Sequence, residues 1–225
     1  MKGRIYQVIL PESLWLFDNT KERMISLDEL IKLRIEALAG WWFVFFRIFM
    51  AVKIITGLDL IRRISRFQIW RFRITTCTHM VHWRDRVYFY NHQRVELQTF
   101  CEQLSDGGIK YPEEFLHQMA NSICLRLPYQ QYLVHGGNFT AQEFACHPVF
   151  SHACDKKLWK KYVKVLDKLS RTFSFFHVGI HSGWVPQNIL PGYGRAISLG
   201  YAGDAWYPPN NSTLGHATYL LPKDE

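Results

Sequence analysis

Apolar residues recur at helical spacing soon after the start of the chain. Ser26 and Glu29 form a capping-box pattern, in which each side chain satisfies a backbone N–H of the first helical turn. The residues that follow place one apolar face on a helix, at Leu27, Leu30, Ile31 and Leu38. The pattern therefore predicts a helix that begins after Ser26 and runs into the apolar sequence beyond it.

Two further helices are predicted in the second half of the chain. Pro112 with the carboxylates of Glu113 and Glu114 is a good helix start, and Pro128 is a good end. Apolar residues between them fall at four-residue spacing, at Phe115, Met119, Ile123 and Leu127. Asp155 begins another helix, whose predicted buried stripe comprises Leu158, Tyr162, Val165, Leu166, Leu169 and Phe173.

Other segments have the pattern of strands. Residues 4–10 and 14–17 are short candidates, residues 67–76 alternate basic and apolar positions, and residues 86–90 are predicted to pair with them. Val95 to Leu104 is predicted to be a helix. The predicted fold class is α+β, a small antiparallel sheet with several amphipathic helices, preceded by an N-terminal helix running into a hydrophobic segment. The predicted division is 1–36 for the N-terminal strand and helix, 37–61 for the hydrophobic segment and 62–225 for the main domain.

Residues 37–58 form the most hydrophobic run. They reach the length of about 20 residues that a bilayer span needs, but Arg47 lies near the middle and Lys53 in the second half. A central arginine costs about 2.5–3.5 kcal/mol on insertion scales, and the surrounding Phe, Trp, Ile, Leu and Val are each mildly favourable, so insertion is marginal. Four arrangements stay open: a span, a re-entrant hairpin turning near Gly40 or Gly57, an interfacial helix, and a buried helix of a soluble core.

Charge favours the membrane arrangements. The chain has 27 Lys and Arg against 19 Asp and Glu, and residues 37–80 alone hold seven basic residues and one acidic residue. The predicted binding residues are therefore Arg47 and the arginines that follow the run, Arg62, Arg63, Arg66, Arg71 and Arg73. Positive charge beside an apolar segment is expected on the cytoplasmic side, so the main domain is predicted to lie there, with membrane lipid as a partner.

Composition limits the other classes. A hydrophobic share of 48% excludes a disordered chain, and five scattered cysteines exclude a dense disulfide scaffold. Two thiols and two imidazoles lie within nine residues, at Cys146, His147, His152 and Cys154. They are candidate zinc ligands, although they lack the usual Cys-x₂-Cys spacing, and candidate groups for a cysteine hydrolase or transferase. No known local signature surrounds either cysteine.

Three function hypotheses follow. The first is a membrane-associated, non-enzymatic interaction protein with a protein partner, for example an accessory or exclusion factor of a secretion or conjugation machinery. The second is a hydrolase or transferase that depends on the Cys and His residues named above. The third is a basic nucleic-acid-binding domain, because arginines alternate with Phe67, Trp70 and Phe72 and the pI is about 9.3.

Overall fold

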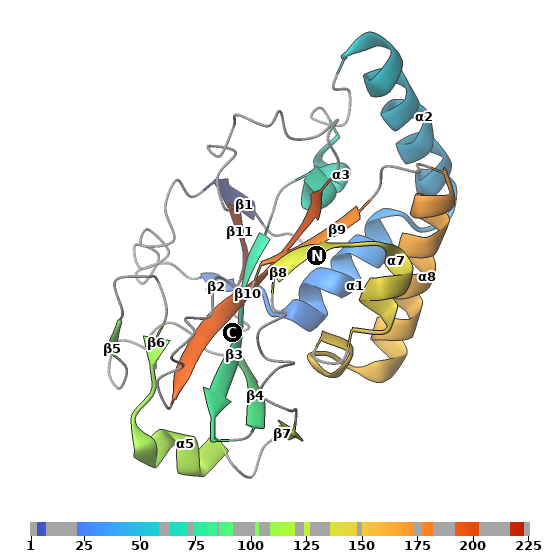
Figure 1. Ribbon diagram of the computed structural model, residues 1–225. Helices are drawn as coiled ribbons and strands as arrows, with labels where there is room; N and C mark the ends of the chain where they lie inside the picture. The colour runs from blue at the N-terminus through green and yellow to red at the C-terminus, as the bar shows by residue number, and fades with distance from the viewer. Residues whose placement is uncertain are drawn as a thin grey trace.

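The computed structural model describes residues 4–7, 22–58, 64–71, 74–84, 86–91, 102–103, 109–119, 124–126, 136–147, 150–172, 177–181, 192–202 and 217–222. Its helices are α1 (Leu27–Ala37), α2 (Trp41–Thr56), α3 (Ser65–Arg71), α5 (Glu113–Met119), α7 (Ala141–Ala145), the 3₁₀ turn η3 (Phe150–His152) and α8 (Lys156–Thr172). In Figure 1, α1, α7 and α8 cover one side of the strands, α2 projects beyond them, and α5 lies at the opposite end.

The described strands belong to one sheet. They are β1 (Arg4–Gln7), β2 (Glu22–Met24), β3 (Ile74–Trp83), β4 (Arg86–Asn91), β5 (Glu102–Gln103), β6 (Ile109–Lys110), β7 (Cys124–Arg126), β8 (Gly136–Phe139), β9 (His177–His181), β10 (Tyr193–Ala202) and β11 (Ala217–Pro222). The main path runs β1-β11-β3-β10-β6-β5. The described pairings are antiparallel except for the parallel pair of β11 and β3, which confirms the predicted α+β class.

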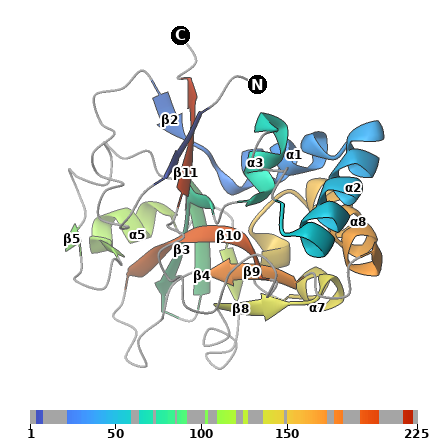
Figure 2. The ribbon, with the colours of Figure 1, turned by 90° about the horizontal axis from the view of Figure 1, so that it is seen from above.

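The two ends of the chain meet in this sheet. β1 pairs with β11 from Arg4 opposite Leu220 to Gln7 opposite Ala217, and β2 pairs with the other edge of β11. Figure 2 shows β1 and β2 beside β11. Strands from the predicted N-terminal region and from the main domain are thus joined by backbone hydrogen bonds.

The core forms around β3. All ten of its residues are buried, because β10, β4 and β11 flank it and helices cover it. The larger apolar cluster joins β3 and β10 to the inner faces of α1, α2, α3 and α8. A smaller one lies under α5 and contains Val81, Trp83, Tyr88, Ile109, Tyr111 and Leu116.

A buried arginine ties the helices to the sheet. Arg34 of α1 is fully buried, and its guanidinium donates to the carbonyl of Ile69 over 3.1 Å, to that of Leu199 over 2.9 Å and to the Tyr162 hydroxyl over 3.1 Å. The indole of Trp70 lies 5.5 Å from the guanidinium carbon and donates back to the Arg34 carbonyl. Because a buried charge is costly without such partners, these contacts fix the relative positions of α1, α3, α8 and β10.

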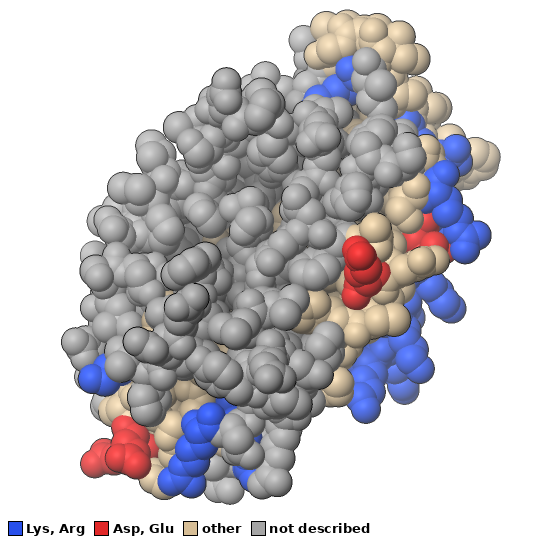
Figure 3. Space-filling view, in the orientation of Figure 1, with Lys and Arg blue, Asp and Glu red and all other residues tan. Residues whose placement is uncertain are grey.

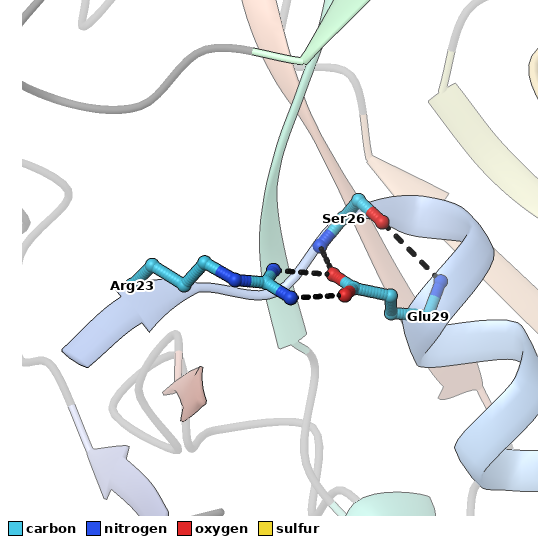
Figure 4. A network of polar contacts seen from close by, with 3 residues as sticks. All are labelled: Arg23, Ser26 and Glu29. Carbon is cyan, nitrogen blue, oxygen red and sulfur yellow. Dashed lines mark hydrogen bonds and ion pairs between the residues drawn. The ribbon is translucent and has the colours of Figure 1, made fainter. Parts of the chain in front are cut away.

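The start of α1 confirms the predicted capping box. The Ser26 hydroxyl accepts from the Glu29 N–H over 3.3 Å, and the Glu29 carboxylate accepts from the Ser26 N–H over 2.9 Å. Arg23 adds two hydrogen bonds to the same carboxylate, of 2.9 and 2.6 Å (Figure 4). Burial acts to raise the pKa of Glu29, but the hydrogen bonds from Arg23 and Ser26 outweigh it and hold the pKa below its ordinary value.

The predicted strand over residues 67–76 is wrong in its first half. Residues 65–71 form α3, and the strand β3 begins only at Ile74. Phe67 and Trp70 are buried three residues apart, on one side of a helical turn, where they pack on the ring of Phe46. Tertiary packing therefore overrides an alternating pattern that has strand character by itself.

Two other predicted helices need correction. α5 begins as expected but ends at Met119, and Cys124–Arg126 form β7, which pairs with β4. Within the predicted helix from Val95 to Leu104, residues Glu102–Gln103 form β5, paired with β6, and the other residues lie outside the described part. The predicted strand at residues 14–17 also lies outside it. The predicted helix after Asp155 and the strand at residues 86–90 are confirmed.

Candidate interaction surface

The hydrophobic run folds as a helix separated from α1 by a sharp bend. α1 ends at Ala37 with Leu38 as its C-cap, and Gly40, with a φ of 61°, precedes α2. A positive φ is readily adopted by glycine, so the predicted straight continuation is broken at this residue. α2 then runs for 16 residues to Gly57, whose φ is 74° and whose N–H donates to the Lys53 carbonyl over 2.8 Å.

One face of α2 is anchored in the core. Phe46 and Met50 are buried, and the ring of Phe46 lies 5.1 Å from that of Phe67 and 6.1 Å from that of Trp70, centroid to centroid. Phe49 and Trp42 also contact the ring of Phe67. These contacts hold α2 against α3 and determine which side of the helix faces outward.

The opposite face of α2 is also apolar, and it is exposed. Its members recur at the spacing of a single helical stripe, with exposed fractions of 79% at Trp41, 43% at Val44, 47% at Phe45, 50% at Ile48 and 81% at Ile55. We call these five residues the outer stripe. A helix that is hydrophobic all round is usually enclosed on all sides, so an open second face is typical of a contact surface.

Positive charge borders the outer stripe, and α2 contains no acidic residue. Arg47 is exposed on the helix itself. Arg66, at the start of α3, places its guanidinium carbon 5.0 Å from the centre of the Trp42 ring and donates to the carbonyls of Glu36 and Ala37 at the end of α1. Arg66 therefore stabilises the corner between α1 and α2, where a cation complements the negative end of the helix dipole.

The other predicted binding arginines are less informative. Arg71 ends α3, but its side chain lies outside the described part of the structure, as do Arg62, Arg63 and Arg73 altogether. No single helix among the described residues has the length and hydrophobicity needed to cross a membrane. α1 and α2 satisfy that test only when taken together, and they are bent by 84° relative to each other.

The predicted Cys and His residues surround the turn between α7 and α8. Cys146 is exposed at the end of α7, whereas His147 is buried. His152 is exposed and shares a 3.0 Å hydrogen bond with the Ser151 hydroxyl through Nδ1. Among the residues that the structure describes, no three His, Cys, Asp or Glu side chains are grouped so that they could hold a metal ion.

Cys154 is a partly buried thiol. Burial raises its pKa, and the carboxylates of Asp28 and Asp155 raise it further, well above the ordinary range. A reactive cysteine needs the thiolate and hence a lowered pKa. The environment of Cys154 therefore favours the protonated, unreactive form.

Sequence reasoning located the apolar helix but not its outer stripe. Every turn of residues 41–55 is apolar, so spacing alone cannot tell which residues face the core. The signal was present in the recurrence at 41, 44, 45, 48 and 55, but it becomes meaningful only when Phe46 and Met50 are seen to be buried.

Comparison with known proteins identifies one structure with a similar fold among those compared. No protein-family model matches the chain, and no curated protein is significantly similar to it in sequence. The chain is similar to a solved structure from work on the accommodation of massive sequence variation in Nanoarchaeota by the C-type lectin fold. The TM-score is 0.54 and the sequence identity is 14%. The match covers 97% of this chain and 94% of the other. At this level of identity the similarity concerns the fold alone, and by fold this chain resembles a C-type lectin domain.

Proposed function

We propose that this chain is a membrane-associated, non-enzymatic interaction protein that docks on a bilayer surface through the outer stripe of α2. The main observation in support of this proposal is the exposed apolar face opposite the buried Phe46 and Met50. Complete removal of one large apolar side chain from water is worth about 1.5–3 kcal/mol. Five such side chains on one helix provide enough free energy for reversible membrane binding.

Contact with a bilayer suits this apolar face better than exposure to water. Trp41 and Trp42 stand at one end of α2, and aromatic residues of this kind are enriched at the membrane interface. Arg47 lies beside the stripe, where its aliphatic stem can pack on apolar surface while its charge reaches the headgroups. The absence of carboxylates on α2 removes the main source of repulsion from an anionic leaflet.

The proposal places α2 along the membrane rather than across it. At 1.5 Å per residue, its 16 residues are about 24 Å long, shorter than the ~30 Å hydrocarbon core. Its inner face also packs on Phe67 and Trp70, which a span would have to leave. An interfacial helix keeps this packing and loses only water on the other side. The main domain then lies on the cytoplasmic side, as the arginine-rich flank suggests.

Two observations support a non-enzymatic interaction role: the fold of the similar structure and the environment of Cys154. The neighbour's C-type lectin fold accommodates massive sequence variation, and a scaffold of that kind is suited to presenting a binding surface. The raised pKa of Cys154 weighs against cysteine-dependent catalysis. We therefore propose that the α2 helix attaches the domain to a membrane, where the rest of its surface contacts a protein partner.

Flotation with phosphatidylcholine vesicles tests the attachment. The double variant Val44→Asn with Ile48→Asn changes the outer stripe only, and we expect it to bind at least tenfold more weakly, because two apolar contacts are lost. The matched control, Val44→Ile with Ile48→Leu, keeps the stripe apolar and should bind like the wild type. Equal binding by the two double variants, or no binding by the wild type, would contradict the proposal.

A further inference from the structure

α8 presents a second surface feature, a row of positive charge. The helix contains six lysines and one arginine against one aspartate. Trp159, Tyr162, Leu166 and Leu169 are buried, and the opposite, exposed side carries Lys157, Lys160, Lys161, Lys164, Lys168 and Arg171. We call these six residues the basic face. Asp167, the one acid of the helix, is paired with Arg171 over 3.0 Å.

The basic face and the outer stripe are held on neighbouring helices by a common anchor. The ring of Trp70 lies 6.1 Å from that of Phe46 on α2 and 6.1 Å from that of Tyr162 on α8. Both helices thus turn their inner faces toward Trp70 and their outer faces away from it. Figures 1 and 2 agree that α2 and α8 lie beside each other at the same edge of the molecule. Figure 3 shows blue Lys and Arg side chains along that edge.

We infer that the basic face binds the headgroups of anionic phospholipids while the outer stripe enters the same leaflet, an inference that rests on the proposed function. Lysine ammonium groups are attracted to phosphate and carboxylate groups, and each lysine close to an anionic surface contributes about a factor of five in affinity. Apolar insertion alone does not distinguish lipids by charge. The basic face gives the protein a preference for membranes rich in negative lipid.

A nucleic acid is the other polyanion that a lysine row would attract, and the neighbouring outer stripe argues against it. Nucleic-acid surfaces combine positive charge with aromatic rings that stack on bases, and the described part of α8 buries its aromatic residues, Trp159 and Tyr162. Trp41 and Phe45 of the outer stripe can stack on bases, but its aliphatic members Val44, Ile48 and Ile55 would remain in water on a nucleic acid. A bilayer offers a partner for each of the two surfaces, acyl chains for the outer stripe and anionic headgroups for the basic face.

The test compares the full-length protein on vesicles of phosphatidylcholine alone and of phosphatidylcholine with 30 mol% phosphatidylserine (about one anionic lipid in three). The wild type should bind the anionic vesicles at least tenfold more tightly. Lys157→Gln with Lys161→Gln should weaken that binding about 30-fold and leave binding to neutral vesicles unchanged. The control, Arg84→Gln with Lys110→Gln, removes equal charge from exposed positions outside α8 and should have no such effect.

Each other outcome is decisive. Equal affinity of the wild type for both vesicles, or an unchanged affinity of the lysine variant, overturns this inference but leaves α2 docking intact. No binding to either vesicle overturns both. If the lysine variant loses affinity for a duplex oligonucleotide and not for anionic vesicles, the basic face serves a nucleic acid and the inference is wrong.

Discussion

The guanidinium of Arg34 donates a hydrogen bond from Nη1 to the hydroxyl of Tyr162 over 3.1 Å, across 128 residues of sequence. Arg34 also satisfies the carbonyls of Ile69 and Leu199, so one side chain joins α1 to α3, α8 and β10. The position of α2, and with it the outer stripe, depends on this arrangement because α2 packs on the Trp70 ring beside Arg34.

Removing this side chain should destabilise the fold strongly. Arg34→Ala leaves two buried carbonyls and the Tyr162 hydroxyl without these donors, so we expect a loss of at least about 3 kcal/mol in the free energy of unfolding. Tyr162→Phe removes a single hydrogen bond and should cost about 1 kcal/mol. Chemical denaturation measures both. A loss below 1 kcal/mol in Arg34→Ala would show that Arg34 does not hold the helices together.

The two faces of α2 should respond differently to substitution. Phe46→Ala opens a cavity between α2, Phe67 and Trp70 and should cost about 3–5 kcal/mol. Ile48→Asn, on the outer stripe, should change stability by less than about 0.5 kcal/mol. Thermal unfolding of the two variants without lipid distinguishes the faces. Comparable destabilisation by both would mean that Ile48 is also enclosed by the protein.

The sequence predicted the α1 cap and the starts of α5 and α8, because these depend on local patterns within one helix. It failed at α3, where Phe67 and Trp70 adopt helical geometry to pack on α2 and α8, a contact between distant segments. It also missed the buried role of Arg34, since arginine on a helix is ordinarily exposed. The outer stripe needed knowledge of which α2 residues face the core.

Acid should destabilise the protein through two buried histidines of β3. Burial lowers the pKa of His79 and of His82 to about 4, from about 6.5 in the unfolded chain. Above pH 6.5 both histidines are neutral in the folded and in the unfolded chain, so their protonation does not change the stability. Between pH 6.5 and 4 the unfolded chain takes up the protons, so stability falls by up to about 1.4 kcal/mol per pH unit for each histidine.

Denaturation curves from pH 7 to 5 measure this slope. His79→Gln should make the slope shallower by about one proton, and adding His82→Gln should make it shallower by about one more. An identical pH dependence in the wild type and in His79→Gln would contradict a neutral, buried His79.

The capping box of α1 should contribute a measurable share of stability. Ser26→Ala removes the acceptor for the Glu29 N–H and should cost about 1 kcal/mol in the free energy of unfolding. Ser26→Asp, which retains a capping oxygen, should recover most of that loss. If the aspartate variant is as unstable as the alanine variant, the serine hydroxyl stabilises the fold by some other contact.

Quenching of Trp41 fluorescence by lipids with brominated acyl chains tests membrane docking most directly. Trp41 is 79% exposed at one end of the outer stripe, so Trp41→Phe keeps the apolar surface while removing one fluorophore. The emission difference between the wild type and Trp41→Phe reports on this indole alone. We predict that brominated lipid quenches that difference when the protein binds vesicles. An unquenched difference with vesicle-bound protein would show that α2 stays in water, and the central claim would be wrong.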